Sequence, residues 1–124
     1  MKDIKCEERI DKHLENVFKD FRVYLSDDDV RNHELPPLDE YALCVDVTDH
    51  QEERPYIRYQ LSWGGPSDEF RVFSKDEIIY VFMDWFDGAR RDVSGTKEGQ
   101  WLIGYLDDLA MFDELESWEG EEDE

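Results

Sequence analysis

The sequence predicts an α+β fold, in which an antiparallel meander of about four strands is flanked by an N-terminal and a C-terminal helix. Three observations predict it. Residues 4–25 carry apolar side chains at spacings of three and four, the period of a helix with one buried face. Residues 41–86 hold strand-like runs whose connections are too short for parallel crossovers. Residues 100–116 return to the helical period.

The N-terminal helix is defined by a single apolar stripe. Its members are Ile10, Leu14, Val17, Phe18, Phe21 and Leu25. Ser26 then resembles a helix N-cap, and the three aspartates after it would favour the helix dipole, so a short second helix is expected to about residue 34. Because Pro36 and Pro37 disfavour helix before them, residues 35–38 are expected to be an extended connector.

Four runs of alternating or continuous apolar character are predicted to be strands. They cover residues 41–48, 56–63, 69–73 and 77–86. The second run places Tyr59 and Trp63 on the side expected to face the core, and Trp85 and Phe86 are also expected there. The fourth run is apolar at nearly every position. This is typical of a central strand covered on both faces, or of a strand with one face in a partner interface.

Residues 88–99 are predicted to form a loop. Arg90 and Arg91 stand between Asp87 and Asp92, so local ion pairs are expected there and not a basic nucleic-acid patch.

The C-terminal helix is predicted over residues 100–116, with Thr96 as a suitable N-cap before it. Residues 1–118 are expected to form one α+β domain, and residues 119–124 an acidic disordered tail.

Negative charge is concentrated in two segments. The chain has 34 Asp+Glu against 14 Lys+Arg, a net charge of −20. Residues 26–53 have ten acids and one base, and residues 100–124 have ten acids and no base. The acids after residue 112 stand at the end of the predicted helix, where they oppose its dipole. Charge kept at a cost to stability indicates a basic partner, and it disfavours binding to free nucleic acid or an anionic membrane.

The acids and one tryptophan of these two segments are the predicted partner-binding residues. They are Asp27, Asp28, Asp29, Glu34, Asp39, Glu40, Asp107, Asp108, Asp113, Glu114, Glu116, Trp118 and Glu119. Trp118 stands among glutamates and is predicted to be an interface anchor. The charge of the chain matches about one turn of duplex DNA, roughly 34 Å. A compact domain of this length has a radius of gyration of about 14 Å and hence a diameter near 35 Å. The protein could therefore present its charge at about the linear density of a short duplex.

No pattern of residues indicates an enzyme. The three histidines, His13, His33 and His50, lack metal-ligand spacing, and the run of aspartates from residue 27 lacks the glycine of a calcium loop. Cys6 and Cys44 form neither a CxxC pair nor a disulfide framework. We therefore expect no catalytic residue, metal or cofactor, no membrane span, and a location in the cytoplasm.

The small size, the acidity and the end EEDE resemble the DNA-mimicking anti-restriction and anti-CRISPR proteins of phages and mobile elements. The segment WGGPSDEFR is similar to small acidic proteins of mobile elements. The resemblance implies an inhibitor that occupies the DNA- or RNA-binding channel of a host defence complex. Two alternatives stay open: an immunity protein or antitoxin that neutralises a basic nuclease, and an adaptor that dimerises through the apolar face of the fourth strand. The plain alternative is an acidic surface that serves solvation alone.

Overall fold

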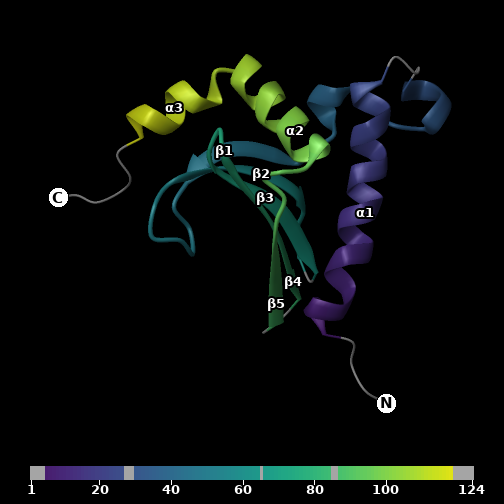
Figure 1. Ribbon diagram of the computed structural model, residues 1–124, viewed down its shortest axis with the longest axis horizontal. Helices are drawn as coiled ribbons and strands as arrows, with labels where there is room; N and C mark the ends of the chain where they lie inside the picture. Colours follow the sequence, from purple (N-terminus) through teal and green to yellow (C-terminus); the bar gives the residue numbers. More distant parts are fainter. Residues whose placement is uncertain (1–4, 27–29, 65, 85–86, 119–124) are drawn as a thin grey trace.

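The computed structural model describes residues 5–26, 30–64, 66–84 and 87–118, and it confirms the predicted α+β class (Figure 1). One antiparallel sheet has its five strands in sequence order, as in a meander. The strands are β1 (Cys44–Thr48), β2 (Tyr56–Ser62), β3 (Ser67–Ser74), β4 (Glu77–Asp84) and β5 (Asp87–Asp92). The helices are α1 (Cys6–Leu25), α2 (Lys97–Asp108) and α3 (Met111–Ser117), with 3₁₀ turns η1 (Val30–His33) and η2 (Leu38–Glu40).

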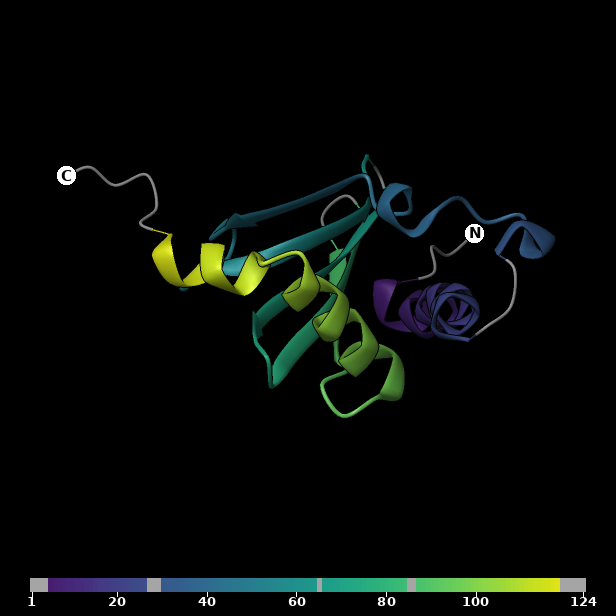
Figure 2. The ribbon, with the colours of Figure 1, turned by 90° about the horizontal axis from the view of Figure 1, so that it is seen from above.

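One face of the sheet, the helix face, is covered by all three helices. Helix α1 packs on β4 and β5, α3 packs on β1 and β2, and α2 contacts both helices (Figure 2). Tyr59, Phe70 and Tyr80 are register partners on three neighbouring strands, and all three are buried. Phe18 of α1 stacks against Phe70, and the Phe21 ring packs against Phe70 at a tilt. The apolar stripe and the strand alternation of the sequence therefore meet in one core.

The opposite face carries a second apolar cluster that no described helix covers. Its buried members are Tyr56, Phe73, Ile79 and Val81. Residues 49–55, which we call the strap, fold over this face between β1 and β2. The Arg54 guanidinium lies 4.2 Å from the Phe73 ring centroid, and the Tyr56 hydroxyl donates to the His50 carbonyl at 2.7 Å. On this face β4 contributes Ile79 and Val81, which are buried, and Met83, which is partly exposed.

Strand β5 replaces most of the predicted loop. Its arginines alternate as strand residues do: Arg90 pairs with Glu52 of the strap at 2.9 Å, and Arg91 pairs with Asp11 of α1 at 3.0 Å. The expected local ion pairs with the flanking aspartates do not form. The strand is short and charged, as edge strands that avoid aggregation often are.

The predicted C-terminal helix is broken into α2 and α3. Ala110 adopts a left-handed conformation, with φ of 63°, and ends the first helix at Asp108. The Thr96 cap is confirmed, because its hydroxyl accepts from the Gly99 amide at 2.9 Å. The short helix expected to about residue 34 is the 3₁₀ turn η1, and residues 27–29 lie outside the described residues.

Trp63 does not join the core. Its side chain is 62% exposed, because β2 ends at Ser62 after a register shift that follows Gln60. Trp85 and Phe86, for which a core position was also expected, lie outside the described residues.

Candidate functional site

Exposed carboxylates are carried by η2, α2 and α3 and by the residue that follows η1. These elements lie along one long side of the molecule, with η1 and α3 at opposite ends of that side (Figures 1 and 2). We call this surface the acidic edge. Its carboxylates are exposed and form no ion pair among the described residues. They belong to Glu34, Asp39, Glu40, Asp108, Asp113, Glu114 and Glu116. Asp107 is exposed too, but it pairs with Lys75 of the β3–β4 turn at 3.4 Å.

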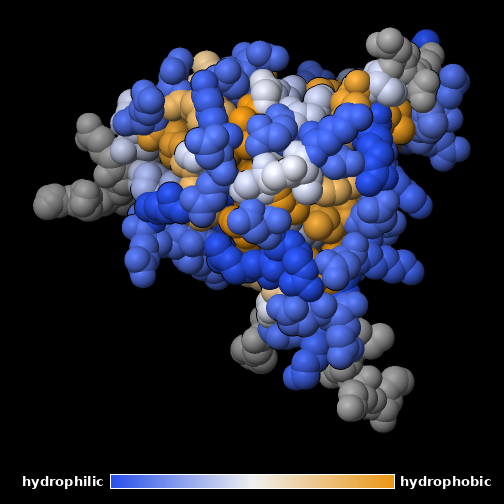
Figure 3. Space-filling view, in the orientation of Figure 1, coloured by the Kyte–Doolittle hydropathy of each residue, from blue (hydrophilic) through white to orange (hydrophobic). Residues whose placement is uncertain are grey.

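The remaining predicted partner-binding residues are placed differently. Trp118 is half-buried at the end of α3, where its backbone amide bonds to the Leu115 carbonyl. Asp27, Asp28, Asp29 and Glu119 lie outside the described residues. In the space-filling view, hydrophilic side chains cover most of the visible face and apolar ones show only in patches between them (Figure 3).

Most arginines are paired with acids outside the acidic edge. Arginines in ion pairs are Arg9, Arg22, Arg54, Arg58, Arg71, Arg90 and Arg91. Their partners lie on α1, the strands, the strap and the first turn of α2. Asp46 and Glu52 of the segment 26–53 form such ion pairs. Asp46 pairs with Arg58 at 2.7 Å, and Glu52 pairs with Arg71 at 2.6 Å. These acids lie outside the acidic edge, whose seven named carboxylates have no ion pair among the described residues.

The break at Ala110 changes which acids oppose a helix dipole. Asp113 and Glu114 fall in the first turn of α3, where negative charge is favourable, so their predicted conflict with the dipole is wrong. The conflict remains at Glu116, in the last turn of α3. It also arises at Asp107 and Asp108, in the last turn of α2, which has no basic residue. Of the two acids in α2, Asp108 has no ion pair with any described residue to offset the cost.

A row of aromatic rings lies beneath the acidic edge, and the sequence analysis did not identify it. Trp101 of α2 stands between Tyr24 of α1 and Tyr105 of α2, with ring centroids 6.2 Å apart on each side and planes within 7° and 11° of parallel. All three rings are half-buried. Burial raises the pKa of Tyr105, and the nearby carboxylate of Asp39 raises it further. The row therefore adjoins the acids of η2.

The row is held firmly by its neighbours. Phe21 packs against Trp101 with centroids 5.0 Å apart, and the Tyr24 hydroxyl donates to the Pro36 carbonyl at 2.5 Å. Tyr41 meets Tyr24 edge-on and donates its own hydroxyl to Asp20 at 2.6 Å. Residues 36–41, which include η2, are thus fixed on α1 by two tyrosine hydrogen bonds, one at each end.

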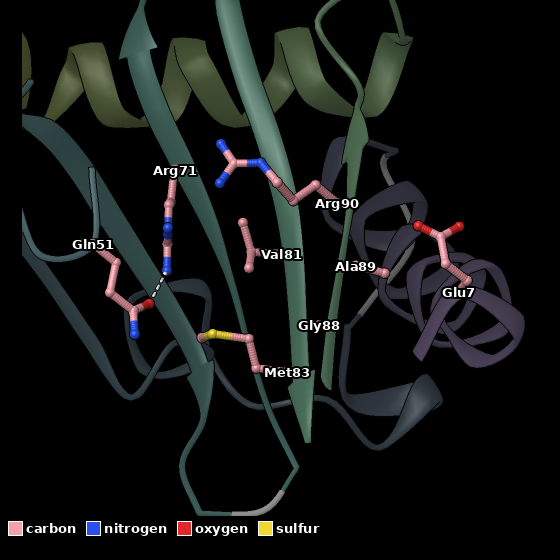
Figure 4. A pocket seen from close by; sticks show the side chains of 8 residues that line it. All are labelled: Glu7, Gln51, Arg71, Val81, Met83, Gly88, Ala89 and Arg90. Carbon is pink, nitrogen blue, oxygen red and sulfur yellow. Dashed lines mark hydrogen bonds between the residues drawn. The ribbon is translucent and has the colours of Figure 1, made fainter. Parts of the chain in front are cut away.

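A groove of about 400 Å³ on the strap side of the sheet is the other candidate site (Figure 4). It is lined by Glu7, Gln51, Arg71, Val81, Met83, Gly88, Ala89 and Arg90. Arg71 is almost fully buried and donates to Glu69 and Glu52, both at 2.6 Å, and to Gln51 at 3.1 Å. Because these bonds occupy its guanidinium, Arg71 is part of the framework and is not available to an anionic ligand.

The Glu52 carboxylate joins the strap to two strands. It accepts from Arg71 and from Arg90. Burial alone would raise the pKa of Glu52, but the two arginine hydrogen bonds outweigh burial and lower it. The strap is therefore locked by a carboxylate that stays ionised at neutral pH.

Histidine and cysteine side chains have packing roles. The His13 ring stacks on Phe82 with centroids 4.4 Å apart. Cys6 is a buried free thiol at the start of α1, and burial raises its pKa. Within the described part of the chain, no cluster of His, Cys, Asp or Glu has the makings of a metal site, and no helix is long and apolar enough to cross a membrane.

No protein-family model matches the chain, and neither a curated protein nor a solved structure matches it. What the acidic edge can do must be inferred from its own residues.

Proposed function

We propose that this protein is an inhibitor whose acidic edge binds the nucleic-acid-binding surface of a host defence complex, in the manner of anti-CRISPR and anti-restriction proteins of phages and mobile elements. It acts by occupancy: carboxylates take the places of phosphates, and no covalent bond changes. The free thiols of Cys6 and Cys44 suit a reducing compartment. We place its action in the cytoplasm of the host cell.

One observation carries the proposal. The carboxylates of the acidic edge have no ion pairs among the described residues, while arginines across the rest of the fold are paired with other acids. Like charges that crowd one surface repel one another and destabilise the folded state. A basic surface would neutralise them, so binding would relieve this repulsion and release counterions as nucleic-acid binding does.

The rigidity of the edge favours a mimic of nucleic acid over a loose polyanion. Its acids project from α2, α3 and η2, and these elements are fixed to the sheet and to α1 by Phe112, Leu106 and Tyr41. Charges held in place before binding lose little conformational freedom when the partner arrives. A rigid anionic row of this kind suits a channel shaped for a phosphate backbone.

The direct experiment is affinity capture from host lysate with the tagged protein at about 0.1 M salt, where the Debye length is roughly 10 Å. We expect a nucleic-acid-binding defence subunit, which rising salt and added duplex DNA or guide RNA displace. Capture of one small toxin nuclease would replace this proposal by the immunity-protein alternative. Capture of nothing at low salt would contradict both.

A second candidate is an adaptor that self-associates. The apolar run of β4 is inside the fold, but Leu43 and Trp63, which flank strands β1 and β2, are 58% and 62% exposed. Analytical ultracentrifugation decides the matter. A concentration-dependent dimer that Trp63→Ser dissociates would support the adaptor, whereas a monomer at every concentration would exclude it.

A further inference from the structure

We infer that the row of Tyr24, Trp101 and Tyr105 is a binding site for an arginine side chain of the basic partner. The inference rests on the proposed function, and it adds a chemical class of ligand and a position to it. Arginine guanidinium groups are attracted to the faces of aromatic rings, most strongly to tryptophan. Here three half-buried rings lie nearly parallel beside a surface of free carboxylates.

The charges around the row favour a cation. Burial is the main cause of the raised pKa of both Tyr105 and Tyr24. A nearby carboxylate raises each pKa further: that of Asp39 for Tyr105 and that of Asp20 for Tyr24. The nearest arginine of α1, Arg22, is occupied by Glu15 at 3.0 Å and Glu98 at 2.7 Å. The cation–ring contacts formed among the described residues involve other rings and not Tyr24, Trp101 or Tyr105.

A buried acceptor beneath the row is the second observation. Tyr59 is 1% exposed, and its hydroxyl has no hydrogen-bond partner among the described residues. Burial raises the pKa of Tyr59, and the nearby hydroxyls of Tyr105 and Tyr24 raise it further. Buried hydroxyls are seldom left without a partner. The Tyr59 oxygen can accept a hydrogen bond, and a guanidinium offers N–H donors in several directions.

The geometry favours arginine over lysine. A guanidinium is planar, weakly hydrated and able to stack on a ring while its N–H groups bond to carboxylates at the rim. An ammonium is compact and strongly hydrated, and it gains less from a row of ring faces. The acidic edge without the row would attract both cations equally, because the Coulomb energy depends only on charge and distance.

Oligo-arginine and oligo-lysine peptides of equal length are the probes. We expect the arginine peptide to bind roughly five- to tenfold more tightly, the ratio that about 1 kcal/mol or slightly more produces. Tyr105→Leu should reduce this ratio to near one and leave the affinity for the lysine peptide unchanged. Phe73→Leu, which removes a ring on the strap face of the sheet, is the matched control and should keep the ratio.

Trp101 offers a second readout in the wild-type fold. The arginine peptide should change the tryptophan fluorescence, and the change should be lost in Trp101→Phe. Equal binding of the two peptides, or a preference that survives Tyr105→Leu, would overturn the arginine site and leave the proposed function standing. If neither peptide binds at low salt, the acidic edge does not bind cationic partners and the proposed function fails with it.

Discussion

Arg71 and Glu52 join the strap to the middle of the sheet, with Nη1 and Oε2 2.6 Å apart. The arginine side chain is 3% exposed and the glutamate 14%. Removing one partner of a buried pair leaves the other uncompensated. In Glu52→Gln, Arg71 keeps Glu69, so we expect a loss of about 1–3 kcal/mol of unfolding free energy in urea titrations.

Glu53→Gln is the control for that measurement, because Glu53 is exposed and has no ion pair among the described residues. It should change the unfolding free energy by no more than about 0.5 kcal/mol. Equal effects of the two substitutions would show that the strap is not fixed by Glu52.

The contribution of Glu52 should depend on pH. Its pKa is lowered in the folded protein, so its stabilisation is complete above the unfolded-state pKa, about 4.3, and is lost as pH falls through the folded-state value. The difference in unfolding free energy between wild type and Glu52→Gln should therefore be constant from neutral pH to about 5 and shrink below that. A difference that does not shrink at all as pH falls below the unfolded-state pKa would contradict this origin.

Two glycines of α2 should respond to alanine in opposite directions. A Cβ at Gly99 would lie 2.4 Å from the Val93 carbonyl oxygen, whereas a Cβ at Gly104 meets nothing within 4 Å. Alanine normally stabilises a helix interior by up to about 1 kcal/mol relative to glycine. We expect Gly104→Ala to raise the melting temperature and Gly99→Ala to lower it. A rise in both would mean that the Val93 backbone yields easily.

Salt should stabilise this protein. The unpaired acids of the acidic edge are exposed to solvent and repel one another. Dissolved ions screen this repulsion, with a Debye length of about 10 Å at 0.1 M salt. The melting temperature should rise by a few degrees when sodium chloride is increased from low to physiological levels. For a chain of this size, such a shift corresponds to a gain of roughly 1 kcal/mol in unfolding free energy. A fall would show that surface ion pairs outweigh the repulsion.

Periodicity in the sequence predicts α1, the first four strands and the Thr96 cap, because each is encoded by neighbouring residues. Strand β5 could not be predicted in this way. Its arginines are satisfied by Glu52 and Asp11, which are distant in the sequence, and a charged edge strand has no apolar alternation. The break before α3 was hidden for a similar reason: the helical period continues to Phe112, although Ala110 is left-handed.

The candidate site was predictable only in its charge. Counting acids by segment identifies the acidic edge, but not that Asp46 and Glu52 are internal partners of arginines. The aromatic row joins Tyr24 and Trp101 across two helices, so it depends on how α1 and α2 pack. The spacing of Trp101 and Tyr105, one helical turn apart, was the one local signal.

The central claim is that the position of the acidic charge, and not its total, determines binding. The most direct test compares capture of basic nucleic-acid-binding protein from host lysate by wild type and by two variants with equal charge. The edge variant carries Asp113→Asn, Glu114→Gln and Glu116→Gln. The control carries Glu8→Gln, Asp49→Asn and Glu53→Gln, exposed acids without ion pairs among the described residues and outside the acidic edge.

We predict that the edge variant retains little of the captured protein at about 0.1 M salt, where screening already limits distant charges, and that the control retains as much as wild type. Equal losses in both variants would show that only net charge matters. Full retention by the edge variant would contradict the proposed interface.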